Sequence, residues 1–240
     1  MNGNQVMIAE NIAAVRQKIA AANILGQTVT LIAVTKNHEA DAVREALAAG
    51  TSDIGENRVQ EAKSKFAELA ADGNADFAAA RRHLIGHLQT NKAKDAVKIF
   101  DLIHSIDSVH LLDAVDKAAA KIDKRQDILI QINLAREETK TGALEEELPE
   151  LLAAAKNATN LRLCGLMLIA PNYENVEDCR PLFAKMRNIF LGIQKSGDFG
   201  AAFRELSMGM SGDYQIAVNE GATMVRVGTA IFGARNYGGR

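Results

Sequence analysis

The chain has 240 residues, enough for one large domain or two small domains with a sizeable core. Hydrophobic residues make up 48% and charged residues 24%, and the formal net charge of −2 gives no reason to expect nucleic acid or an anionic membrane as a partner. The N-terminus lacks a signal-peptide pattern, and no segment approaches the roughly 18 apolar residues of a membrane span, so we expect a cytoplasmic protein.

The chain is predicted to begin with an amphipathic helix over about residues 4–24. Ile8, Ile12 and Ile19 recur near the helical period of about 3.6 residues, which places them on one face. After Gly26, short apolar segments alternate with helical ones. The predicted strands cover 28–36, 52–57, 81–86, 99–107, 127–134, 161–170, 202–209 and 223–228, and the predicted helices 39–50, 58–73, 88–97, 108–123, 145–157, 175–196 and 213–220.

This alternation favours an α/β fold with a parallel sheet. Eight strand–helix units are what a (β/α)8 TIM barrel requires. The alternative is a doubly wound open sheet, but the turn after the first strand, "TKNHEA", has no glycine for the usual dinucleotide-binding turn. We therefore predict one domain over 1–240, with a barrel at about 28–235 and an extra N-terminal helix. Ser108 is expected to cap its helix, and Pro181 to lie in the first turns of another.

Small and hydroxyl-bearing residues follow the seventh and eighth predicted strands. Phosphate commonly binds at these two exits in barrels, because glycine admits an anion close to backbone N–H groups. Each loop alone is also typical of an ordinary turn, but the pair at this place predicts a phosphate cup. Its candidate residues are Ser207, Gly209, Ser211, Gly212, Gly228 and Thr229.

Lys36 follows the apolar first strand. A solvated surface charge is the ordinary interpretation of a lysine at a strand end, but a lysine across the barrel mouth from a phosphate cup suits Schiff-base chemistry. Arg226, two residues before Gly228, is a candidate for the cation that keeps such an amine neutral. The alternative for Arg226 is a salt bridge with a carboxylate beneath the barrel.

Other polar residues near predicted strand ends have two interpretations each. Asn57 either bonds a ligand or caps the helix that follows, and His83 is either a ligand contact or a satisfied core histidine. Met208 is a further candidate for the pocket wall. No set of His, Cys and carboxylate residues has metal-ligand spacing, so no metal is predicted, and no residue is assigned a catalytic role.

Six segments, in order, resemble the signatures of the pyridoxal-phosphate homeostasis proteins. These segments are "AVTKN", "IGENRVQEA", "HLIGHLQTNK", "GLMLIAP", "SMGMSGDY" and "VRVGTAIFG", which together run from about residue 31 to 233. Members of that family are single-domain barrels similar to the N-terminal domain of alanine racemase. Two departures from the family pattern are Arg82 and Leu168.

The resemblance implies that Lys36 carries pyridoxal 5′-phosphate (PLP) as an internal aldimine and that Arg226 faces the pyridine nitrogen. It also implies that Asn57 lies close to the cofactor. The residues that would hold the phosphate are Ser207, Gly209, Gly228 and Thr229.

The resemblance further implies binding and delivery of PLP more than turnover. An arginine beside the pyridine nitrogen leaves that nitrogen unprotonated and the ring a weaker electron sink. Alanine racemase compensates with a tyrosine from its partner subunit's C-terminal domain, whereas this chain ends at Arg240 soon after the barrel, and its three tyrosines, Tyr173, Tyr214 and Tyr237, include no substitute.

We therefore expect a monomeric PLP carrier whose partners are PLP and PLP-dependent apo-enzymes. The first alternative is a PLP-dependent amino-acid racemase. The second is a cofactor-free aldolase-type barrel that uses Lys36 on a sugar phosphate.

Overall fold

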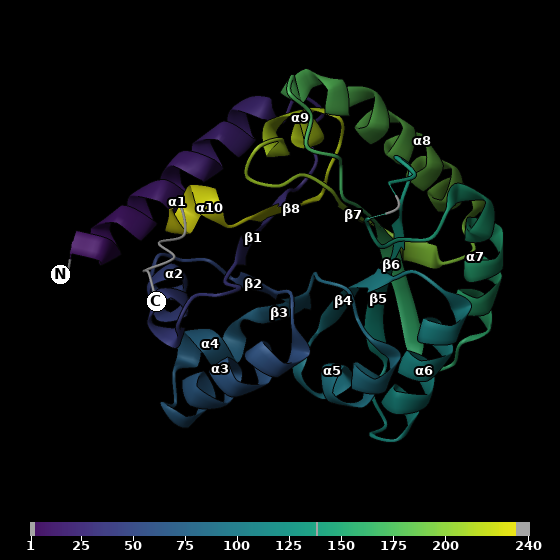
Figure 1. Ribbon diagram of the computed structural model, residues 1–240, viewed down its shortest axis with the longest axis horizontal. Coiled ribbons are helices and arrows are strands. Elements are labelled where there is room, and N and C mark those ends of the chain that lie inside the picture. Colours follow the sequence, from purple (N-terminus) through teal and green to yellow (C-terminus); the bar gives the residue numbers. More distant parts are fainter. Residues whose placement is uncertain (1–2, 138, 234–240) are drawn as a thin grey trace.

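In the computed structural model, which describes residues 3–137 and 139–233, eight parallel strands close into a barrel in the order β1 to β8 (Figure 1). This confirms the predicted (β/α)8 fold and excludes the doubly wound sheet; the predicted barrel end at residue 235 lies outside the described residues. The strands are β1 Thr30–Val34, β2 Asp53–Glu56, β3 Arg81–Leu84, β4 Leu102–Ile106, β5 Gln126–Ile132, β6 Leu161–Leu168, β7 Glu205–Ser207 and β8 Met224–Val227.

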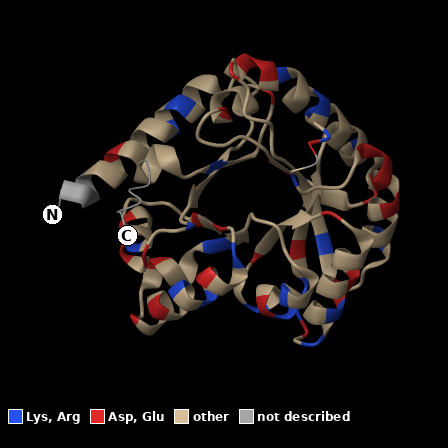
Figure 2. Ribbon diagram, viewed as in Figure 1, with Lys and Arg blue, Asp and Glu red and all other residues tan. Residues whose placement is uncertain are grey.

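Helices surround the barrel on its outside (Figure 1). The α-helices are α1 Gly3–Ala22, α2 Ala40–Ala48, α3 Val59–Ala71, α4 Ala75–Ala79, α5 Ala93–Ile99, α6 Val109–Ala120, α7 Leu148–Asn157, α8 Arg180–Ser196, α9 Tyr214–Asn219 and α10 Thr229–Phe232. Short 3-10 turns are η1 Thr90–Lys92, η2 Glu145–Glu147, η3 Val176–Cys179 and η4 Gly200–Ala202. None of the helices in the described ranges has an apolar stretch suited to crossing a membrane. Figure 2 shows charges of both signs interspersed along the surrounding helices.

Apolar side chains fill two separate regions because successive residues of a strand point to opposite faces. The larger region lies between the strands and the helices. The smaller one fills the inside of the barrel, the lumen, where Met224 shares a strand face with Arg226 and Leu102 shares one with His104. Its buried members are Ile32, Leu102, Leu129, Cys164, Met167 and Met224.

Helix α1 covers the sector where the barrel closes. The helices that flank β8 are short, with six residues in α9 and four in α10, and α1 packs across both of them and α2 (Figure 1). The Asn11 side chain donates to the carbonyl oxygen of Ile231 at 2.8 Å. Ile12, which is 1% exposed, lies on the buried face, as the periodicity predicts. The extra helix therefore replaces the missing length of the last barrel helix.

Capping residues and proline in the sequence predicted some of the helix ends. Ser108 caps α6 by accepting from the Leu111 N–H at 3.2 Å, and Pro181 lies in the first turn of α8, as predicted. The five-residue helix α4 was not predicted, because its signal is one short cap. There the Asn74 side chain accepts from the Phe77 N–H at 2.9 Å, and Phe77 packs on Phe66 with ring centroids 5.4 Å apart.

Gly165, in β6, sets the position of β7. It adopts φ +156° at a register shift, and a Cβ there would lie 1.7 Å from the carbonyl oxygen of Glu205. Gly165→Ala should therefore push β7 outward and lower the free energy of unfolding by about 2–4 kcal/mol, measured by urea denaturation. Gly192→Ala in α8, where an added Cβ meets nothing within 4 Å, is the control and should be neutral or stabilising. Equal unfolding free energies for the two variants would contradict this account.

Candidate functional site

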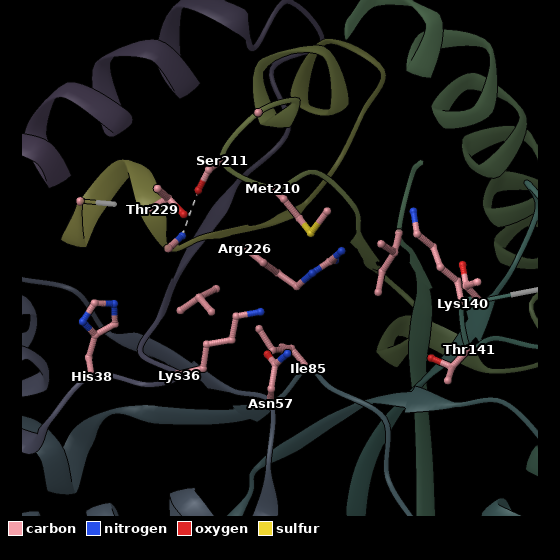
Figure 3. Close-up of a pocket in the computed structure, with 16 residues that line it drawn as sticks. Lys36, His38, Asn57, Ile85, Lys140, Thr141, Met210, Ser211, Arg226 and Thr229 are labelled. Carbon is pink, nitrogen blue, oxygen red and sulfur yellow. Dashed lines mark hydrogen bonds between the residues drawn. The ribbon is translucent and has the colours of Figure 1, made fainter. Parts of the chain in front are cut away.

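A cavity of about 500 Å³ opens at the barrel mouth, where the carboxyl ends of the strands meet. This volume lies in the range of small-molecule sites. Seven of the candidate residues named from the sequence line it: Lys36, Asn57, Ser211, Gly212, Arg226, Gly228 and Thr229. Figure 3 shows Lys36 and Arg226 reaching into the cavity, with Asn57 beside Lys36.

Lys36 lies on a tight turn directly after β1. Asn37 adopts φ +59°, and the N–H of His38 donates to the carbonyl oxygen of Thr35 at 3.1 Å. This turn directs the Lys36 side chain across the mouth toward Arg226 (Figure 3). His38 also lines the cavity, and its ring lies 4.7 Å from that of Phe232, centroid to centroid. The predicted lysine thus projects into a pocket.

A buried ion pair supports this turn from below. Lys65, on α3, donates to the carbonyl oxygen of Thr35 at 2.8 Å and to the carboxylate of Glu56 at 2.7 Å. The Thr35 hydroxyl donates to the same carboxylate oxygen at 2.6 Å. Glu56 is fully buried and Lys65 nearly so. Burial raises the pKa of Glu56, and the Lys65 ammonium partly opposes that rise. The pair therefore fixes the backbone that carries Lys36.

The two loops predicted to form a phosphate cup meet at Ser211. Its hydroxyl oxygen accepts from the backbone N–H of Gly228 at 3.2 Å and from that of Ala230 at 3.4 Å. The dashed line in Figure 3 marks the first of these bonds. Gly212 and Thr229 line the cavity on either side. Two backbone donors from one loop thus converge on an oxygen atom supplied by the other loop, as they would on an oxygen of an anion.

Ser207, Met208 and Gly209 do not line the cavity. Strand alternation turns Ser207 into the lumen and Met208 into the outer core, and Met210, two residues further along, lines the cavity instead. Gly209 has a structural role. It adopts φ +94°, its carbonyl oxygen accepts from the Arg226 N–H at 3.0 Å, and a Cβ there would lie 2.6 Å from that of Ala217.

Arg226 is buried in β8 with 3% exposure. Its Nη1 donates to the Ser207 hydroxyl at 2.7 Å, and its Nη2 donates to the carbonyl oxygen of Leu168 at 2.9 Å. Burial lowers its pKa to about 10, with Asp213 opposing, so it stays charged at neutral pH. Within the described part of the chain, its side chain makes no ion pair with a carboxylate. The predicted alternative, a salt bridge beneath the barrel, is therefore not the arrangement found.

The structure also places the four other residues singled out in the sequence. Asn57 does not cap α3, since the N-cap is Arg58, and it lines the cavity. His83 is a fully buried core histidine with hydrogen-bond partners on both ring nitrogens, and it does not line the cavity. Of the two departures from the family pattern, Arg82 pairs with Asp101 at 2.9 Å, and the Leu168 side chain packs in the outer core, so both lie away from the cavity.

The loop after β5 also lines the cavity, and sequence reasoning missed it. Thr139, Lys140 and Thr141 line the cavity. Figure 3 shows Lys140 and Thr141 on the side opposite Lys36. Lys140 is held by the carbonyl oxygen of Ala170 at 3.0 Å and by Glu137 at 2.6 Å. The only local signal is the polar run "TKTG" after the fifth strand.

Comparison with known proteins identifies the family. The profile described as alanine racemase, N-terminal domain, matches residues 5–236. Proteins called pyridoxal phosphate homeostasis protein in Pseudomonas aeruginosa and Escherichia coli K12 are 42% and 41% identical to this chain. Each alignment covers 96% of this chain and 97% of the relative. This chain belongs to the pyridoxal phosphate homeostasis protein family.

Solved structures agree with this assignment. PipY of Synechococcus elongatus, a 40% identical protein, has been solved without and with PLP bound, with TM-scores of 0.84 and 0.79; the likeness covers 94% of this chain and 100% of PipY. The alanine racemase of Clostridium difficile is 16% identical with a TM-score of 0.68, and only 58% of that chain is covered. The second likeness is one of fold alone.

Proposed function

We propose that this protein binds PLP in the mouth cavity, holds it through an imine bond to Lys36, and supplies it to PLP-dependent apo-enzymes with little or no turnover of its own. The observation that carries the proposal is the convergence of three groups on one cavity. These are the Lys36 amine, the Arg226 guanidinium and the cup formed by Ser211, Gly228 and Thr229.

Each of these groups has a part in holding the cofactor. When bound, PLP supplies an aldehyde that condenses with a primary amine with loss of water, and a ring that withdraws electrons. Ser211, Gly212, Gly228 and Thr229 hold the phosphate, and Asn57 lies against the ring. Ser207 and Gly209 act from behind, through their bonds to Arg226.

Arg226 favours storage over turnover. A guanidinium stays protonated at neutral pH and only donates hydrogen bonds, so it leaves a neighbouring pyridine nitrogen unprotonated. Burial lowers the pKa of Arg226 only to about 10, so the guanidinium remains protonated at neutral pH. The relatives that match over nearly their whole length are called homeostasis proteins, and PipY has been solved with PLP bound. Both facts support the carrier role.

Absorbance spectroscopy tests the proposal. The ligand-free protein, given one equivalent of PLP and desalted, should show a visible absorbance band that borohydride removes. After reduction, mass spectrometry should find the added mass of PLP on the peptide that contains Lys36. PLP mixed with free lysine is the control. A colourless desalted protein would overturn the proposal and favour the aldolase-type alternative. Racemisation of any amino acid at enzymatic rates would overturn the low turnover.

Transfer tests the carrier role. The loaded protein, mixed with an apo-enzyme that depends on PLP, should restore its activity when a trap removes free PLP. Restoration that vanishes with the trap would leave buffering of free PLP as the only route and contradict direct delivery. Light scattering of the loaded protein alone tests the predicted monomer.

A further inference from the structure

Five buried polar side chains form a continuous hydrogen-bonded row across the lumen. They come from β2, β3, β4, β7 and β8, and we call them the lumen relay: Asp53, His83, His104, Ser207 and Arg226. The four links measure 2.9 Å from Asp53 to His83, 2.9 Å from His83 to His104, 2.9 Å from His104 to Ser207 and 2.7 Å from Ser207 to Arg226.

With neutral histidine rings, the ionised Asp53 carboxylate at one end dictates the direction of every bond in the relay. At the other end Ser207 Oγ accepts from Arg226, which only donates, and Ser207 directs its own proton to the unprotonated Nδ1 of His104. His104 then donates from Nε2 to Nδ1 of His83. His83 in turn donates from Nε2 to Asp53, and an ionised carboxylate only accepts. One proton per link satisfies the whole row without conflict.

This pattern requires both histidines to be neutral, and their surroundings agree. Both rings are fully buried, and burial lowers the pKa of each; for His104 the nearby Arg226 charge lowers the pKa further. At the far end, burial raises the pKa of Asp53, but the hydrogen bonds from His83 and Ser52 outweigh it and leave the pKa below its ordinary value. The relay thus joins a cation to an anion through neutral groups.

We infer that Asp53, His83, His104 and Ser207 are positioning residues that hold the Arg226 guanidinium in one orientation and stabilise its buried charge without a carboxylate in contact. Each acceptor in the row turns its negative end toward Arg226, and the Asp53 charge polarises the row in the same sense. Among the residues that the structure describes, Ser207 and Leu168 accept from two of the five N–H donors of Arg226, which leaves the remainder for a ligand in the cavity. The consequence for PLP rests on the proposed function.

The first test uses the ligand-free protein and needs no cofactor. Nitrogen NMR of the histidine rings at neutral pH should show His83 and His104 as neutral rings protonated on Nε2. A charged ring, or a proton on Nδ1 of either residue, would overturn the directed relay. This measurement stands even if the protein binds no PLP, in which case the proposed function alone fails.

The second test breaks the relay away from Arg226. His104→Leu removes both bonds of the central ring, while His104→Gln keeps one donor and one acceptor. In the PLP-loaded protein, His104→Leu should shift the visible band in the same direction as Arg226→Gln and weaken PLP retention about tenfold, and His104→Gln should restore most of both. A folded His104→Leu protein with the wild-type band and retention would overturn the positioning role. If His104→Leu does not fold, the NMR result decides.

Discussion

Replacing Lys36 with alanine is expected to abolish the borohydride-reducible band of the PLP-treated protein completely. The side chain that reaches into the cavity would end at Cβ, so no amine would remain at the end of β1 to condense with the aldehyde. The phosphate cup stays intact, so Lys36→Ala should still retain some PLP non-covalently, about 10- to 100-fold more weakly. Desalting followed by absorbance and mass spectrometry measures both quantities.

Lys140 is the matched control for this prediction, because it is a second lysine that lines the same cavity. Its ammonium is held by Glu137 and by the carbonyl oxygen of Ala170, so it is poorly placed to attack an aldehyde. Lys140→Ala should keep the reducible band on the peptide that contains Lys36. If the band persists in Lys36→Ala and disappears in Lys140→Ala, the attachment point has been assigned to the wrong lysine.

Lys65→Met should produce the largest loss of stability. It leaves the Glu56 carboxylate fully buried without its cation, and also removes the donor to the Thr35 carbonyl oxygen. Breaking a buried pair in this way lowers the free energy of unfolding by about 3–5 kcal/mol. Lys63→Met is the control on the same helix: Lys63 is 54% exposed and lies 3.5 Å from Asp95, a surface pair worth about 0–1 kcal/mol. Urea denaturation of both variants measures the difference.

The loss in Lys65→Met should depend on pH. Burial already raises the pKa of Glu56 in the folded protein, and removal of Lys65 should raise it further. Between the ordinary carboxyl pKa and this raised value, the folded state binds more protons than the unfolded state, so stability falls as pH rises. The deficit should therefore be smaller at about pH 5 than at about pH 8. A deficit that is independent of pH would mean that the variant loses packing alone.

Most of the fold could be predicted because its signals are local. Apolar runs of strand length, helical periods and caps such as Ser108 lie within a few residues of one another. The closed barrel followed from their number and order. Helix α4 was missed because a single cap at Asn74 starts only five residues of helix. The role of α1 was missed because it depends on how short α9 and α10 are.

Less of the site could be predicted, because its geometry is set by tertiary structure. Sites in barrels form at the carboxyl ends of the strands, and this general rule was enough to predict that Lys36, Arg226, Gly228 and Thr229 share one cavity. It could not choose between Ser207, which ends the seventh strand, and Ser211, which follows it, since only the path of the backbone after the strand decides which of the two faces the cavity. The lumen relay has no sequence signal at all, because its members lie on five strands and meet only when the barrel closes.

Strand β7 is only three residues long and has one register pair with β8, Ser207–Met224. Backbone N–H groups also link the two segments, from Thr223 to Leu206 at 3.0 Å, from Met208 to Met224 at 3.1 Å and from Arg226 to Gly209 at 3.0 Å. Short strands with few pairings are the segments that open most readily in folded proteins. Ser207 bonds Arg226 in the relay, and Ser211 bonds Gly228 in the phosphate cup. One local opening of this segment would therefore break both contacts at once. A ligand that binds only the closed form would then suppress the opening by mass action. Opening of the contact between β7 and β8 would thus control the rate at which the cofactor is released.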